Sequence, residues 1–358
     1  MNGYIALEDG TVIEGVSVGD HKPALGEIVF NTGMTGYQEI LTDPSYAGQI
    51  VVLTYPLIGN YGINDKDIES NKVQVSGFII KDYCENPSHW QNEKTILQYL
   101  KENNIPCISN VDTRMLTKKI RNKGAMKCLI TTKEVTKEMQ ENLKQYSFPK
   151  DIVSKVSCDK SYHYEGKGKK IGLIDLGIKK GIINQLIKLN CDITVFPWNV
   201  KEEILLNNKF DAIFLSNGPG DPKDLISVIE LCKKLVGKIP LFGICLGNQI
   251  LALALGADTY KLKFGHRGSN HPVINLKNNK VFITSQNHGY GVKDTTFTSE
   301  MMKTYVNVND NTIEGFESNE LCIKAVQFHP EEGPGPEDTH DIFGYWINSL
   351  KEGDKNAN

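Results

Sequence analysis

Residues 169–256 alternate between short apolar segments and segments with helical spacing, and this alternation restricts the fold more than any other feature of the chain. Short apolar runs are typical of buried strands, and apolar residues three or four positions apart are typical of helices that pack on a sheet. The alternation predicts a doubly wound α/β domain with a mixed or parallel sheet buried on both faces. The expected strands are 169–177, 191–198, 210–216 and 239–247, and the expected helices are 178–190, with Ile182, Ile183, Leu186 and Ile187 on its buried face, 200–208, 223–235 and one that begins near residue 246.

The rest of the sequence extends this domain and adds a smaller one before it. Further strands are expected within 281–292 and 313–332, followed by an amphipathic helix at 340–352. Short strand patterns separated by turn residues dominate the first 150 residues, with helical patterns at 93–104 and 113–124, which predicts a β-rich α+β domain. The predicted organisation is an N-terminal domain at 1–150, a polar, lysine-rich linker at 151–168, the α/β domain at 169–352 and a tail at 353–358.

Charge and composition argue against several classes of function. The net charge of −3 gives no sign of the basic stripe that nucleic-acid binding requires. No segment approaches the ~18 consecutive apolar residues of a membrane span, and the first residues lack the pattern of a signal peptide. The eight cysteines include no C-x-x-C pair, so neither a zinc site nor a disulfide framework is expected. We therefore expect a cytoplasmic protein without a metal site.

Cys245 is the cysteine whose position calls for a chemical role. It stands in Gly-Ile-Cys-Leu-Gly (243–247), at the junction of an expected strand and an expected helix. This pattern is similar to the G-x-S-x-G nucleophile elbow, in which flanking glycines leave the reactive side chain uncrowded. The free amides at the helix N-terminus favour a thiolate and can stabilise an oxyanion. Cys245 is therefore a candidate nucleophile.

A cysteine nucleophile needs a group that carries protons to the leaving group. Two histidines stand at the ends of expected strands, where a side chain can reach a neighbouring elbow: His288 in QNHGYG and His329 in QFHPEE. His329 is followed two residues later by Glu331, a carboxylate that could fix the orientation of the imidazole. The residue pattern favours His329 only slightly, and both histidines stay open as candidates.

Five segments together resemble the glutaminase domain of class I glutamine amidotransferases, and they occur in that family's order. They are FLSNGPGDP (214–222), GICLGNQ (243–249), FGHRGSNHP (264–272), SQNHGYGV (285–292) and QFHPE (327–331). The segments 26–62, 111–126 and GPGP at 333–336 are also similar to those of the small, glutamine-hydrolysing subunits of carbamoyl phosphate synthetases. The resemblance covers about residues 3 to 350.

The resemblance implies a role for each matching position. Cys245 would attack the side-chain amide of L-glutamine, His329 would act as general acid and base, and Glu331 would orient His329. Backbone amides of Gly218 and Leu246 would hold the oxyanion. The remaining contacts to glutamine would come from Ser45 in the N-terminal domain and from Gly220, Gln249, Asn287, Gly289 and Tyr290.

The resemblance also implies a partner. Ammonia would pass to a large subunit that uses MgATP and bicarbonate to make carbamoyl phosphate. This chain itself would need no cofactor, and it contains no G-x-x-x-x-G-K-[ST] phosphate loop. Three positions depart from the family pattern, because Asn248 replaces a common histidine and Glu332 and Gly333 replace alanine and serine.

Three other functions are weighed against this one. The same glutaminase chemistry could serve another synthase, although the N-terminal segments favour carbamoyl phosphate synthesis. A catalytically silent module would tolerate loss of the thiol, but Cys245, His329 and Glu331 are all present. An unrelated cysteine hydrolase, such as a peptidase, would react with peptidyl electrophiles rather than with glutamine-like ones.

Overall fold

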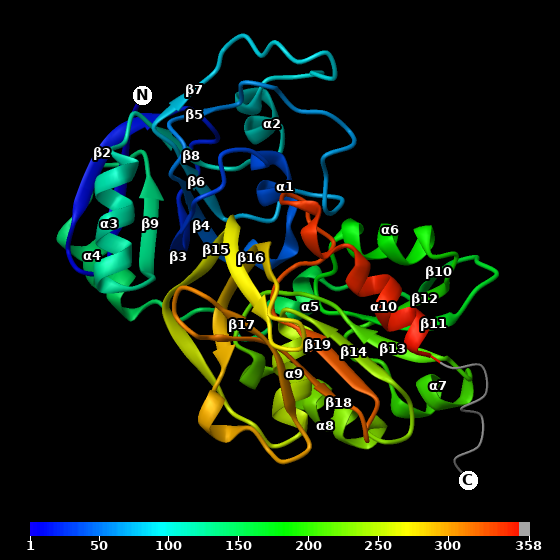
Figure 1. Cartoon of the computed structure of the whole chain (residues 1–358). Coiled ribbons are helices and arrows are strands. Elements are labelled where there is room, and N and C mark those ends of the chain that lie inside the picture. Colours follow the sequence, from blue (N-terminus) through cyan, green and yellow to red (C-terminus); the bar gives the residue numbers. More distant parts are fainter. Residues whose placement is uncertain (351–358) are drawn as a thin grey trace. The chain divides into compact units, whose positions relative to one another are not determined.

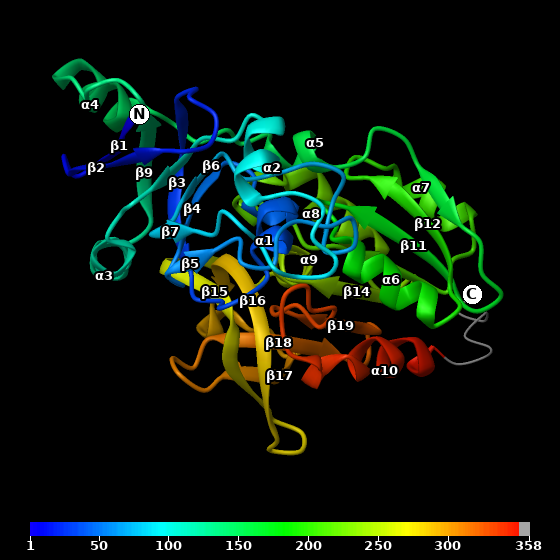
Figure 2. The same cartoon turned by 90° about the horizontal axis from the view of Figure 1, so that it is seen from above.

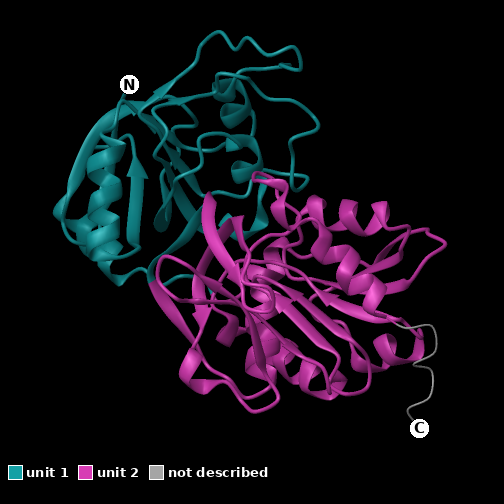
Figure 3. Cartoon of the chain, in the orientation of Figure 1, with its two compact units in different colours: residues 1–149, 263–268 teal, residues 150–262, 269–358 magenta. Residues whose placement is uncertain are grey.

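The computed structural model describes residues 1–350 (Figure 1). The predicted tail at 353–358 and the last two residues of the predicted α/β domain lie outside the described residues. Contacts between Cα atoms divide the chain into two compact units (Figure 3). Unit 1 comprises residues 1–149 and 263–268, and the described part of unit 2 comprises residues 150–262 and 269–350. The short segment 263–268, which contributes to unit 1, interrupts unit 2 in the sequence.

Unit 1 contains a closed seven-stranded barrel. Its strands are, in order around the barrel, β1 (Asn2–Leu7), β2 (Val12–Ser17), β8 (Cys107–Ser109), β6 (Gly77–Ile79), β4 (Gln49–Leu53), β3 (Ala24–Asn31) and β9 (Met126–Thr131). Antiparallel pairing of β9 with both β1 and β3 closes the barrel. A separate two-stranded sheet joins β5 (Leu57–Ile58) and β7 (Asp82–Tyr83).

The barrel strands bury both of their faces, because successive side chains of a strand point in opposite directions. Phe30 and Val52 pack in one hydrophobic cluster, whereas the adjacent residues Val29 and Val51 pack in another. Helix α3 (Thr113–Lys123) contributes to the first cluster, and helices α1 (Tyr37–Thr42) and α2 (Ile96–Glu102) contribute to the second. The remaining helical elements of unit 1 are η1 (Pro44–Tyr46) and α4 (Lys137–Gln145).

Unit 2 is built on a ten-stranded mixed sheet. Its strands are, in spatial order, β10 (Tyr162–Tyr164), β12 (Asp192–Pro197), β11 (Lys170–Asp175), β13 (Ala212–Leu215), β14 (Leu241–Ile244), β19 (Ile323–Val326), β18 (Ile313–Ser318), β17 (Met302–Asn307), β15 (Thr259–Asn275) and β16 (Val281–Val292). The five strands from β12 to β19 pair in parallel, and the strands on either side of them pair antiparallel where their register is defined.

Helices cover both faces of the parallel strands (Figure 2). Helices α6 (Lys180–Lys188) and α10 (Asp341–Ser349) pack in one hydrophobic cluster, and α7 (Glu202–Asn207), α8 (Ile226–Leu235) and α9 (Leu246–Ala254) pack in the other. Leu241 of β14 faces the second cluster, whereas Phe242 faces the first. This burial on both faces explains why the parallel strands are apolar throughout. The short helical segments of unit 2 are α5 (Ile152–Val156), η2 (Pro222–Asp224), η3 (Asp294–Thr296) and η4 (Glu337–Thr339).

Two local expectations differ from the structure. Ile187 of α6 is 44% exposed rather than buried, because Ile182, Ile183 and Leu186 already fill the face that α6 turns to the sheet. Residues 151–168, predicted as a linker, contain helix α5 and strand β10, which forms the edge of the sheet by pairing with β12. Within residues 1–350, no helix has the length and apolar character needed to cross a membrane.

Candidate active site

Cys245 occupies a strained turn between β14 and α9. Its backbone has φ 54° and ψ −103°, a conformation that costs free energy for any residue with a side chain. Two backbone hydrogen bonds hold the turn: the Cys245 amide donates to the Val326 carbonyl at 2.8 Å, and the Cys245 carbonyl accepts from the Gln249 amide at 3.2 Å. A strained residue between a strand and a helix is the geometry of a nucleophile elbow.

The two glycines of the elbow are required for close packing of the backbone. A Cβ atom at Gly243 would lie 2.7 Å from the backbone of Gly247, and one at Gly247 would lie 2.3 Å from the carbonyl oxygen of Leu215. Both distances are too short for a Cβ atom, so both positions need glycine for α9 to approach β13 and β14. This reason differs from the sequence-based one, which was that the glycines leave space around the thiol.

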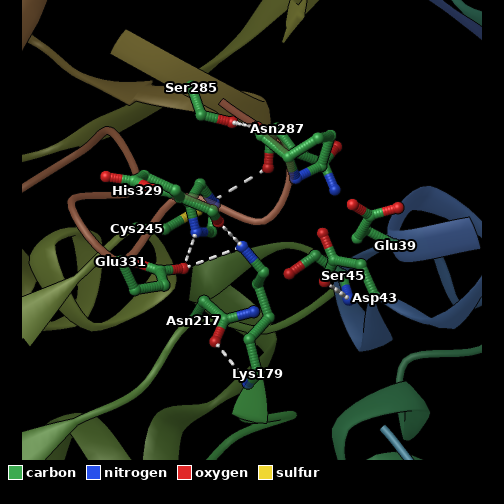
Figure 4. Close-up of polar contacts among 12 residues, drawn as sticks. Glu39, Asp43, Ser45, Lys179, Asn217, Cys245, Ser285, Asn287, His329 and Glu331 are labelled. Atoms are coloured by element: carbon green, nitrogen blue, oxygen red, sulfur yellow. Dashed lines mark hydrogen bonds and ion pairs between the residues drawn. The ribbon is translucent and has the colours of Figure 1, made fainter. Parts of the chain in front are cut away.

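Cys245, His329 and Glu331 come together at the carboxyl ends of neighbouring parallel strands (Figure 4). The His329 Nδ1 atom lies 2.6 Å from Glu331 Oε1, and both side chains are buried. The Nε2 atom of His329 is buried without a hydrogen-bond partner of normal geometry among the described residues, while Cys245 is close enough to influence the His329 pKa. One ring nitrogen of His329 is therefore engaged by a carboxylate, and the other is left for chemistry at the sulfur.

Neighbouring charges set the protonation states of this pair. Burial, the largest influence, would lower the pKa of His329, because it disfavours an imidazolium. The charge of Glu331, assisted by Cys245, outweighs burial and the opposing effect of Lys179 and raises the pKa of His329 to about 10. Burial would raise the pKa of Glu331, but Lys179 and His329 together lower it to about 2. At neutral pH the site therefore holds an imidazolium and a carboxylate.

Lys179 completes this buried cluster, and the sequence analysis did not identify it. Its ammonium donates to Glu331 Oε1 at 3.0 Å and also to the carbonyl of Glu332. The Lys179 backbone amide donates to Asn217 Oδ1 at 3.1 Å. The side chain is only 2% exposed, so its charge is compensated almost entirely by these neighbours. Lys179 thus fixes the position of Glu331 and keeps it ionised.

Substitution of Lys179 by methionine is expected to destabilise the fold. Removing one partner of a buried ion pair lowers the free energy of unfolding by about 3–5 kcal/mol, because the other charge stays buried without its partner. The pKa of Glu331 is depressed, so the stabilisation is present above its usual value of 4.5 and is lost as the pH falls towards about 2. The difference in unfolding free energy between wild type and Lys179→Met should therefore be largest at neutral pH.

Urea denaturation from pH 7 down to pH 3 measures this difference. Lys180→Met is the matched control, because Lys180 is the next residue on α6 and its side chain is partly exposed. A Lys179→Met variant as stable as Lys180→Met at pH 7 would contradict the assigned role.

A group of amide side chains surrounds the sulfur. Gln327 Nε2 lies 3.6 Å from Cys245 Sγ, and the Gln327 side-chain oxygen accepts from Asn248 at 3.2 Å and from Gln249 at 3.1 Å. Gln249 also donates to the Tyr290 carbonyl at 2.8 Å. On the other side of the sulfur, the carbonyl of Asn287 lies 3.7 Å away. Gln249, Asn287 and Tyr290, all expected to contact a ligand, thus lie on the segments around Cys245, and Gly289 lies on the same strand, β16.

The expected oxyanion donors are neighbours of each other. A Cβ atom at Gly218 would lie 2.8 Å from a side-chain carbon of Leu246 and 2.1 Å from the Leu176 carbonyl, so only glycine fits there. The Leu246 amide is in the first turn of α9, where a helix offers amides no acceptor of its own. Gly220 has φ 93° and belongs to the same loop after β13 as Gly218.

Two further residues named in the sequence analysis make hydrogen bonds within their own segments. The ring nitrogens of His288 contact the Tyr290 carbonyl at 2.7 Å and the Gln286 side-chain oxygen at 2.8 Å, so both are engaged within β16. Ser45 belongs to unit 1, where it is buried in η1 and its amide donates to Asp43 Oδ1 at 2.8 Å. The contact of Ser45 with a ligand stays a prediction.

The residues missed by sequence reasoning gave only a weak signal. Lys179 follows strand β11, and Gln327 follows strand β19. Ligand sites of open α/β sheets lie at the carboxyl ends of strands, and this rule could have singled out both. Their residue types alone do not single them out. Lys179 is part of a segment with helical spacing, and Gln327 stands two residues before His329, which is the stronger candidate for a catalytic role.

Comparison with known proteins agrees with this architecture. Residues 172–348 match the family described as class I glutamine amidotransferase, which is the class that the α/β fold and its cysteine elbow define. Residues 5–130 match the family described as carbamoyl-phosphate synthase small chain, CPSase domain.

Curated relatives extend the match to nearly the whole chain. The chain is 50% identical to the carbamoyl phosphate synthase small chain of Caldanaerobacter subterraneus, covering 96% of this chain and 95% of the relative. It is 50% identical to the pyrimidine-specific small chain of Bacillus subtilis, covering 99% and 98%, and 51% identical to the small chain of Clostridium perfringens, covering 96% and 98%. The chain belongs to the family of carbamoyl phosphate synthase small chains, the glutamine-hydrolysing subunits of that synthase. The fold class and the family resemblance predicted from the sequence are confirmed.

Proposed function

We propose that Cys245 is the nucleophile that releases ammonia from L-glutamine in this chain. The observation that carries the proposal is the position of the Cys245 sulfur at a strained elbow, beside an imidazole that is itself held by Glu331 and Lys179. A thiolate is stabilised next to an imidazolium, and the pKa of His329 favours that charged form at neutral pH.

The reaction divides into two steps. The Cys245 thiolate attacks the side-chain carbonyl carbon of glutamine, and the amides of Gly218 and Leu246 stabilise the oxyanion. The His329 imidazolium donates its Nε2 proton to the leaving nitrogen, so that ammonia departs and a γ-glutamyl thioester remains. His329 then takes a proton from water, whose oxygen attacks the thioester carbonyl carbon. The C–S bond breaks, the γ-carboxyl of glutamate is released, and the Cys245 thiolate is regenerated beside the His329 imidazolium. Glu331 holds the ring through Nδ1 in both steps.

Further residues would bind the substrate. We assign contacts to glutamine to Gln249, Asn287 and Tyr290, whose segments surround the sulfur. Gly220, Gly289 and Ser45 are assigned by resemblance. Since the chemistry needs only these side chains and amides, no cofactor is required in this chain.

The ammonia would be consumed by a large-chain partner. The relatives are named small chains, and we propose that this chain likewise assembles with a large subunit that makes carbamoyl phosphate from ammonia, bicarbonate and MgATP. We further propose that the complex works in the cytoplasm.

Reconstitution with the large chain tests the whole proposal. The purified complex should form carbamoyl phosphate from glutamine as well as from ammonium. Without this chain, the large chain should use ammonium but not glutamine. A glutamine-like electrophile should inactivate glutamine-dependent synthesis and spare ammonia-dependent synthesis, while a peptidyl electrophile should do neither. A complex that uses ammonium only, or that is inactivated by the peptidyl reagent, would contradict the assignment.

A further inference from the structure

The turn that carries Glu331 is connected to helix α10 by an ion pair that no catalytic role accounts for. Glu332, the residue after Glu331, contacts His340 through its carboxylate, and His340 precedes the first residue of α10. The two side chains are 15% and 30% exposed.

Glu332 is connected to the site by its backbone. Its amide donates to the His329 carbonyl at 3.3 Å, and its own carbonyl accepts from the Lys179 ammonium. Lys179 and His329 are the two residues that hold the Glu331 carboxylate. Any displacement of the Glu332 backbone therefore moves groups that are hydrogen-bonded to Glu331.

The backbone of Glu332 also needs support. Its φ is 69°, in the left-handed region that residues with a side chain adopt only when their surroundings hold them there. Helix α10, which follows His340, is packed on the sheet: Trp346 stacks on Phe242 of β14 with ring centroids 5.2 Å apart, and Phe343 is buried. The Glu332–His340 contact is thus a direct connection between this anchored helix and the strained turn.

We propose that the Glu332–His340 ion pair positions the catalytic turn, and that His340 is a positioning residue for glutamine hydrolysis in this chain. The inference rests on the proposed function, because it acts through Glu331 and His329. Charges from several elements surround the pair: Glu337 of η4 and Lys188 of α6 act on Glu332, and Asp338 and Asp341 flank His340 in sequence. Burial raises the pKa of Glu332, while His340 and Lys188 oppose that rise, so a neighbouring cation helps to keep the carboxylate charged.

Four variants test the pair in the full chain complexed with its large-chain partner, with glutamate release as the readout. His340→Gln and Glu332→Gln should each lower kcat about fivefold, as expected for loss of a partly buried ion pair of roughly 1 kcal/mol. The double variant should be no slower than either single variant, because the pair can be lost only once. His340→Lys keeps the cation and should restore at least half of the wild-type kcat.

Rescue by the conservative variant separates positioning from a general structural effect. His340→Gln removes the cation that faces the Glu332 carboxylate, whereas His340→Lys keeps a cation at the same position. A merely structural role of the imidazole ring would leave both variants equally impaired, but a positioning role of the charge should leave only His340→Gln impaired. Lys233→Gln, which removes an exposed ion pair with Glu230 on α8, is the control and should match wild type.

Several outcomes would overturn the inference. They are a His340→Gln kcat equal to that of Lys233→Gln, additive losses in the double variant, or no recovery with His340→Lys. If His340→Gln does not fold, Glu332→Gln and His340→Lys still decide the matter. Cys245→Ser, measured alongside, distinguishes failure of the proposed function from failure of this inference. If Cys245→Ser still hydrolyses glutamine, the proposed function is wrong. If Cys245→Ser is inactive and His340→Gln is unimpaired, only the positioning role is refuted.

Discussion

Replacement of Cys245 by serine is expected to abolish glutamine-dependent synthesis and to leave ammonia-dependent synthesis intact. A serine hydroxyl is far less acidic than a thiol. Glu331, which stays in place in this variant, favours the protonated form of the neighbouring His329 imidazole, and an imidazolium is a poor acceptor for the hydroxyl proton. Loss of an essential nucleophile lowers kcat by at least ~1000-fold.

Both activities should be measured on the reconstituted complex, since the ammonia-dependent rate reports whether the complex has assembled. Cys322→Ser is the matched control, because Cys322 is an exposed cysteine of the same unit. Cys322→Ser should keep both activities. Glutamine-dependent synthesis that persists in Cys245→Ser would show that the nucleophile is a different residue.

The second large effect is expected at His329, with a smaller one at Glu331. His329→Ala removes the group that moves protons to the leaving nitrogen and from water, and such groups contribute about 100- to 10,000-fold. Glu331→Ala leaves the imidazole in place and loses only its orientation and charge partner. We therefore expect Glu331→Ala to slow glutamine hydrolysis less than His329→Ala does.

The pH dependence of Glu331→Ala provides a second readout. Glu331 contributes to the raised pKa of His329, so its removal should lower that pKa. The high-pH limb of kcat/KM, which reports loss of the imidazolium, should then move from near pH 10 to lower pH. Glu331→Gln, which keeps the side-chain volume, should show the same direction of shift. A Glu331 variant slower than His329→Ala, or a limb that moves to higher pH, would contradict these roles.

Local patterns in the sequence were sufficient for the α/β part of the fold. The spacing of apolar residues predicts β11 to β14 and the helices between them, because each strand or helix is specified by its own segment. The elbow is equally local: Gly243, Cys245 and Gly247 lie within five consecutive positions, 243–247, and this short segment is enough to identify the turn.

The closure of the barrel in unit 1 could not be predicted in this way. It depends on the antiparallel pairing of β1 with β9, in which Tyr4 faces Thr131. Strand patterns alone do not specify which distant strands pair or in which register. For the same reason, nothing in the sequence shows that 263–268, inside the long strand β15, contributes to unit 1.

For the site, the sequence alone identified Cys245 as the candidate nucleophile and did not decide between His288 and His329 as its partner. The tertiary structure decided which histidine lies next to the thiol: His329 is beside Cys245, while both ring nitrogens of His288 are engaged in β16. It also brought in Lys179, which is 152 residues from Glu331, and Gln327, which is 82 residues from Cys245. A nucleophile within one turn can be recognised from adjacent residues. The charged groups around it, such as Lys179 and Glu331, belong to segments that follow other strands of the sheet, and only folding brings them to the same edge.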